Sequence, residues 1–189
     1  SDVCSSDLSM FATATCFDSD LSKWEVSKVT TMDSMFNAAT SFNGDISKWD
    51  VSKVTILTSM FNSATSFNGD ISKWDVSRVK TINDMFNNAK SFNGDLSKWD
   101  VSNVAEMYGM FDTALSFNSD LSTWDVSRVT SIDAMFSGEY RGKALHPADL
   151  DAVLERAAAS GSHAQSRSTA NIRVALAVWG AAGHSSTKR

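Results

Sequence analysis

The chain has 189 residues, with 17 basic and 22 acidic side chains and a formal net charge of −5. Nucleic-acid-binding domains usually carry a basic face, so this balance argues against a nucleic-acid partner. Of the two cysteines, Cys4 lies in an N-terminal segment that we exclude below, which leaves Cys16 without a partner, so no disulfide framework is expected.

The first eight residues, SDVCSSDL, differ from everything that follows. They resemble the translation of a common sequencing-adapter oligonucleotide. We therefore expect residues 1–8 to be an adapter-derived artefact and exclude them from the fold prediction. On this interpretation the chain is a truncated piece of a longer array, and any signal peptide or lipid anchor would have been lost with the missing part.

A tryptophan recurs every 25 residues from Trp24 onward, and most other apolar residues share that spacing. The tryptophans are Trp24, Trp49, Trp74, Trp99 and Trp124. A fixed period of roughly 20–50 residues is typical of solenoids, propellers and similar stacks. A unit of this size buries too little apolar surface to fold alone and depends on its neighbours. Residues 9–138 are therefore expected to form one solenoid of about five units, with the tryptophans as its structural core.

Each unit contains two apolar periodicities. Around Trp49 and Val51 polar and apolar residues alternate, which predicts a half-buried strand. After Thr55, a candidate N-cap, the spacing becomes helical, at Leu57, Met60, Phe61 and Ala64. We therefore predict an α/β solenoid, leucine-rich-repeat-like, with a parallel sheet on one side and short helices or 3₁₀ turns on the other. The alternative is a β-solenoid.

Beside the tryptophans, an acidic column and a basic column run along the predicted sheet face. We interpret them as a candidate ladder for binding a partner, because solenoids use extended faces in this way. The alternative is a solvated face on which the two columns neutralise each other. The residues of the ladder are Glu25, Asp50, Asp75, Asp100, Asp125, Lys23, Lys48, Lys73 and Lys98.

A second acidic column follows the Asn-Gly turn and consists of Asp20, Asp45, Asp70, Asp95 and Asp120. Calcium binding by these carboxylates is a less favoured alternative, because each unit supplies a single aspartate. We expect them to accept backbone N–H groups in the turn instead. An ice-binding face is also less favoured, because its threonine column is broken at Lys80 and Ala105.

Residues 139–189 have a different composition and contain the only proline, Pro147. Leu150, Val153, Leu154 and Ala157 predict one amphipathic helix that could cap the array. The alternative is a non-native or disordered tail. A second apolar stretch, 172–182, is too short to span a bilayer, so no membrane span is expected in this fragment. The three histidines lie in this tail with no metal-site spacing, so no metal or cofactor is expected.

The repeated string F-N-x-D-[LI]-S-x-W-D-V-S-x-V-x-x-M-x-x-M-F-x-x-A resembles the BspA-type surface-protein repeats, a family also found in mycoplasma-type lipoproteins. The resemblance covers about residues 9–138. It implies a cell-surface or extracellular location and an adhesion-like role in binding a protein or glycan. It implies no catalytic residues.

The sequence likewise contains no hydrolase elbow, P-loop or dinucleotide fingerprint, so no enzyme motif contradicts this expectation. We therefore expect a non-catalytic surface module that binds through its sheet face. The alternative is a structural spacer within a larger surface protein.

Overall fold

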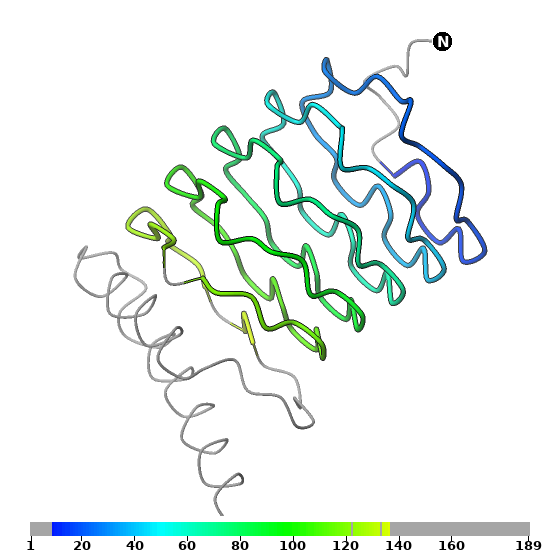
Figure 1. The fold of residues 1–189 in the computed structure, drawn as a ribbon. Coiled ribbons are helices and arrows are strands. Elements are labelled where there is room, and N and C mark those ends of the chain that lie inside the picture. The colour runs from blue at the N-terminus through cyan, green and yellow to red at the C-terminus, as the bar shows by residue number, and fades with distance from the viewer. Residues whose placement is uncertain (1–8, 122, 133, 137–189) are drawn as a thin grey trace, which may run out of the picture.

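The computed structural model describes residues 9–121, 123–132 and 134–136. In these residues the chain winds into successive coils that stack one on the next (Figure 1). Side-chain hydrogen bonds join residues that are 25 apart in sequence, such as Asn43 to Asn68, so one repeat makes one coil. The expected artefact at 1–8 and the predicted cap or tail at 139–189 lie outside the described residues.

The predicted α/β architecture is wrong. The described residues contain no helix, and their strand-like pairing is limited to four isolated parallel bridges. One residue of each coil takes part, in the order Thr31, Ile56, Thr81, Glu106 and Ser131. Neither a parallel sheet with helices behind it nor a β-solenoid built from regular strands describes this part of the chain.

The segment predicted to be helical is a run of tight turns. Met60 and Ala64 each donate their backbone N–H to the carbonyl three residues earlier, at 3.2 and 3.0 Å. The N–H groups of Ser59 and Phe61 donate instead to the next coil, at 2.8 Å and 2.9 Å. An α-helix would satisfy its N–H groups internally. Successive backbone N–H groups therefore alternate between an acceptor in the same coil and an acceptor in the next coil. The second set of hydrogen bonds holds neighbouring coils together.

These turns place residues in the left-handed region. Type II turns need a positive φ at their third residue, and Ser59 and Ser63 have φ values of 52° and 58°. In all, nine described non-glycine residues have positive φ, whereas Gly109 is the only such glycine among the described residues. The helical spacing of Met60, Phe61 and Ala64 still directs all three side chains inward, where they are fully buried.

The predicted strand around Trp49 is also wrong as hydrogen-bonded structure. Backbone N–H groups of Trp49 and Val54 close turns onto Ile46 and Val51, at 3.1 and 2.8 Å. The predicted N-cap, Thr55, donates its backbone N–H to Thr30 of the preceding coil at 2.8 Å. The predicted alternation of inward and outward side chains nevertheless holds, since Trp49 and Val51 are buried and Asp50 is exposed.

Aromatic rings form the centre of the stack. Within a coil, Phe61 and Phe67 lie face to face, with ring centroids 3.9 Å apart and planes 4° from parallel. Phe61 also stacks on Phe86 of the next coil at 5.7 Å. The same pairs recur along the described coils, so each coil is held to its neighbours by ring contacts as well as by backbone hydrogen bonds.

Candidate functional site

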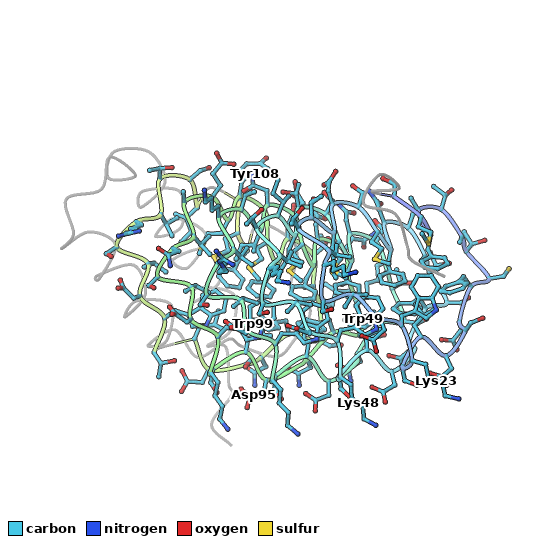
Figure 2. All side chains as sticks on the ribbon, turned by 90° about the horizontal axis from the view of Figure 1, so that it is seen from above. Lys23, Lys48, Trp49, Asp95, Trp99 and Tyr108 are labelled. Carbon is cyan, nitrogen blue, oxygen red and sulfur yellow. The ribbon has the colours of Figure 1, made fainter. Side chains whose placement is uncertain are left out.

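The charged ladder lies on an exposed edge of the coils. All nine of its predicted residues are exposed. Figure 2 shows Lys23 and Lys48 on the same edge as Asp95, which belongs to the second acidic column. The edge is made of tight turns rather than the predicted sheet face, because the strand expected to carry it is absent from the described coils.

The aspartates of both columns close those turns. The backbone N–H of Ser52 donates to Asp50 Oδ1 at 3.1 Å, and that of Ser47 donates to Asp45 Oδ1 at 2.9 Å. The equivalent bond recurs in other coils, at Asp20, Asp70, Asp75, Asp95, Asp100 and Asp125. The turn role predicted for the second column is therefore present in successive coils, and it extends to the first column, where it was not expected.

The serines that follow these aspartates lower the pKa of the carboxyl groups. Hydrogen bonds from the Ser47 hydroxyl and then the Ser47 backbone N–H lower the pKa of Asp45 below its ordinary value. The same serine donors lower the pKa of Asp50, through Ser52. A donor aimed at a carboxylate favours the charged form, so these aspartates are ionised at neutral pH and bonded to their own turns.

The lysines add a smaller electrostatic effect. After the serine donors, the charge of Lys48 also lowers the pKa of Asp45 and of Asp20 in the preceding coil. Lys53 acts in the same direction on the pKa of Asp50. The edge therefore consists of alternating acidic and basic rows that partly neutralise one another, and its lysine ammonium groups face solvent.

The tryptophans lie in the interior beside this edge. Trp49, Trp74, Trp99 and Trp124 are buried, and Trp24 in the first coil is partly exposed. The indole N–H of Trp74 donates to the Ile46 carbonyl of the preceding coil at 3.2 Å, and Trp49 bonds Leu21 in the same way at 3.0 Å. A buried indole normally needs such a partner, so the rings are used by the stack and are not available to bind a sugar.

An asparagine column is a feature that the sequence reasoning passed over. The Asn43 carboxamide oxygen accepts the backbone N–H of Asn68 at 2.8 Å, and Asn68 does the same for Asn93. The sequence contains the pattern from which this column could have been predicted, because an asparagine follows the phenylalanine of most repeats. Its amide oxygen satisfies a backbone donor that the coil itself leaves open.

The described residues contain neither a metal-binding cluster nor a membrane-spanning helix. Among the described residues, no three His, Cys, Asp or Glu side chains gather in a way that could hold a metal ion. Over the same ranges, no helix has the length and apolar character needed to cross a bilayer. Cys16, in the first coil, is a free and exposed thiol.

Comparison with known proteins places the repeats in a family. The profile of the family described as "Mycoplasma protein of unknown function, DUF285" matches residues 5–81 and again residues 68–144. The chain belongs to the DUF285 family. The two matches together span well over half of its 189 residues. Searches of curated proteins and of solved structures find no match. Membership of DUF285 supports a repeat protein, and it does not single out the BspA-type repeats.

Proposed function

We propose that this DUF285 chain is a non-catalytic repeat module that binds a protein or glycan through the exposed charged ladder. The proposal includes an adhesion-like role at a cell surface, in line with the resemblance of the repeats to BspA-type surface proteins. Solenoid-like arrays offer long regular surfaces, on which many weak contacts can act together.

The exposed lysine row carries the proposal. Lys23, Lys48, Lys73 and Lys98 occupy the same position in four successive coils and are all exposed. By contrast, the recurring aspartates, asparagines and indoles are engaged in hydrogen bonds of the stack. The neighbouring aspartates offset part of the lysine charge, but the ammonium groups still form a row of cations at a fixed repeat, which complements a partner that carries acidic groups along its length, such as an acidic glycan or an acidic protein segment.

A variant that changes only the lysines tests this proposal. Replacing the four ladder lysines with glutamine removes their charge and keeps most of their length. Binding to a glycan array and to detergent-extracted cell-surface proteins should fall at least about tenfold, which corresponds to roughly 1.4 kcal/mol. Unchanged binding by this variant would exclude the lysine row as the site.

The matched control neutralises the acidic row without breaking its turns. In the triple variant Asp50→Asn, Asp75→Asn, Asp100→Asn, each carboxamide still offers an oxygen to the following serine N–H. This control should bind an acidic partner at least as tightly as the parent chain does. Substitution to lysine is unsuitable here, because it would remove the turn acceptor at Asp50 along with the charge.

A spacer role is the second candidate. The ring column that runs through Phe36, Phe61, Phe86 and Phe111 without interruption favours it, because continuous stacking stiffens the array. A spacer would keep its function when the surface lysines are replaced. A parent chain that binds nothing in either assay, together with a lysine variant that folds and still positions a fused domain correctly, would support the spacer.

A further inference from the structure

The coils carry a second, partly exposed edge whose residues differ from coil to coil. At the position of Ile56 the successive coils have Thr31, Ile56, Thr81, Glu106 and Ser131. At the position of Tyr108 they have Asp33, Thr58, Asn83 and Tyr108, and the position of Lys80 also varies. We call these three columns the variable edge. The ladder column, in contrast, is lysine in four of its five coils.

Tyr108 of the variable edge lies on the opposite side of the coils from Lys48 of the ladder. Figure 2 shows Tyr108 at one edge of the coils and Lys48 and Asp95 at the other, with Trp49 and Trp99 between them. A partner bound to one edge would therefore leave the other accessible. A binding site on the variable edge is separate from the proposed function and does not require the ladder to bind anything.

Contacts between coils hold several polar side chains of the variable edge and the backbone of Tyr108 in place. The hydroxyl oxygens of Thr58 and Thr81 are 3.3 Å apart. The Asn83 amide donates to Glu106 Oε2 at 2.9 Å, and Asn83 Oδ1 accepts the backbone N–H of Tyr108 at 2.8 Å. Side chains that are already ordered lose less conformational entropy when a partner binds.

Large apolar side chains are exposed on this edge. Ile56 is 36% exposed and Tyr108 is 46% exposed. The stack does not need them, because other coils have threonine, aspartate or asparagine at the same positions. Tyrosine is enriched among the residues that dominate protein–protein binding energies, and an aliphatic side chain gains by burial against another apolar group. This chemistry suits a protein partner better than a glycan.

A cation lies between the two apolar residues along the stack. Lys80 is exposed and belongs to the coil between those of Ile56 and Tyr108. The neighbouring acidic side chain, Glu106, already accepts the Asn83 amide. We infer that the variable edge binds a protein segment that places apolar side chains on Ile56 and Tyr108 and a carboxylate opposite Lys80. Sequence variation between the coils makes this a site for one particular segment rather than for a repeating polymer.

The experiment uses a displayed library of random twelve-residue peptides as the probe, selected on the full chain. Peptides enriched by the selection should contain an acidic residue beside apolar ones. Their affinity should fall about tenfold or more for the double variant Ile56→Thr, Tyr108→Asn and for Lys80→Thr. Each replacement is a residue that other coils carry at the same position, so the stack should tolerate it.

The matched control is the ladder variant Lys48→Thr, Lys73→Thr, which copies Thr123 of the last described coil. It should bind the selected peptides within about twofold of the parent chain. Failure of the library to enrich any peptide would overturn the inference. Peptides that bind the variable-edge variants as tightly as the parent would overturn it as well. If the selected peptides lose affinity only for the ladder variant, the inference about the variable edge is overturned and the proposed function is supported.

Discussion

At the residue scale, the most unusual feature is the set of left-handed backbones without glycine. Ala38 has a φ of 57° and donates its N–H to Asn62 of the next coil at 2.7 Å. A residue with a Cβ loses about 1–2 kcal/mol in the left-handed region, which glycine adopts without this penalty. The hydrogen bond to the next coil holds the strained conformation, so strain is tolerated here in exchange for stacking contacts.

Replacing Ala38 with glycine should therefore stabilise the chain. We expect a gain of about 0.5–1 kcal/mol, because the relief of strain exceeds the added flexibility of the unfolded chain. Urea unfolding would measure this gain in the free energy of unfolding. The neighbouring Ala39→Gly is the control, because Ala39 is fully buried and is not among the positive-φ residues. That change should destabilise, and a loss of stability at Ala38 as large as that at Ala39 would contradict the strain argument.

A second residue-scale prediction concerns Gly69. A Cβ at this position would lie 2.9 Å from Cε2 of Phe67, whose ring is fully buried and stacked on Phe61. The ring must shift to make room, which disturbs its stacking: in the coil where Ser119 supplies a Cβ, the equivalent rings of Phe111 and Phe117 are 13° from parallel, against 4° for Phe61 and Phe67. Gly69→Ala should therefore cost about 1–3 kcal/mol in unfolding free energy.

The control for Gly69 is Ser19→Ala in the first described coil. Ser19 occupies the same column and already has a Cβ, so this change should have little effect in the same unfolding experiment. Equal losses at Gly69 and Ser19 would show that the clash with Phe67 is not the cause.

At the scale of one coil, the aspartate turns predict how stability depends on pH. Serine donors lower the folded-state pKa of Asp20, Asp45, Asp50, Asp70 and Asp95. A depressed folded-state pKa adds stability that is fully present above the ordinary aspartate value of about 3.9. That stability is lost as the pH falls from the ordinary aspartate pKa through the lowered pKa values of the folded state. The chain should therefore be less stable at pH 3 than at pH 7.

Urea unfolding across this pH range measures the effect. The variant Asp45→Asn, Asp70→Asn, Asp95→Asn keeps an oxygen for each turn but has no carboxyl group to titrate there. Its loss of stability on acidification should be smaller than that of the parent chain. An identical pH profile for the two proteins would show that these turns are not responsible.

The coil is also the scale at which sequence reasoning succeeded in part. The apolar spacing at Met60, Phe61 and Ala64 identified the side chains that point inward, and the alternation around Trp49 did the same. Neither pattern specifies where a backbone N–H finds its acceptor. A helix and a run of turns with left-handed residues can bury the same side chains, so the element type was wrong while burial was predicted correctly.

The candidate site was predictable to a similar extent. Exposure of the Lys48 and Asp50 columns follows from their alternation with Trp49 and Val51, and the structure places them outside. The turn role of Asp50 was missed because it depends on the Ser52 N–H, which a predicted strand would have used for pairing. Tyr108 and Ile56 were not predicted as site residues, because the prediction rested on residues that recur at the same position of every repeat and these two occur once each.

At the scale of the whole molecule, the hydrogen bonds and ring contacts of the described residues join each coil to the coil before it and the coil after it. Rings, indole N–H groups and alternate backbone N–H groups all cross the same boundaries. In such arrays the stability is close to a sum of terms for the coils and for the contacts between neighbours. The position of a residue along the stack should therefore matter as much as its type.

Tryptophan substitutions in different coils test this dependence on position. Trp74 is 4% exposed, bonds the Ile46 carbonyl and stacks on Trp49 at 6.5 Å. Trp74→Ala should cost about 3–5 kcal/mol, because it opens a cavity and removes one of the two donors to the Ile46 carbonyl, which keeps only the backbone N–H of Trp49. Trp24 is partly exposed in the first described coil, so Trp24→Ala should cost clearly less. Denaturant unfolding compares the two variants. Equal losses would mean that the coils unfold as one unit, insensitive to position, and would contradict a stability built from contacts between neighbours.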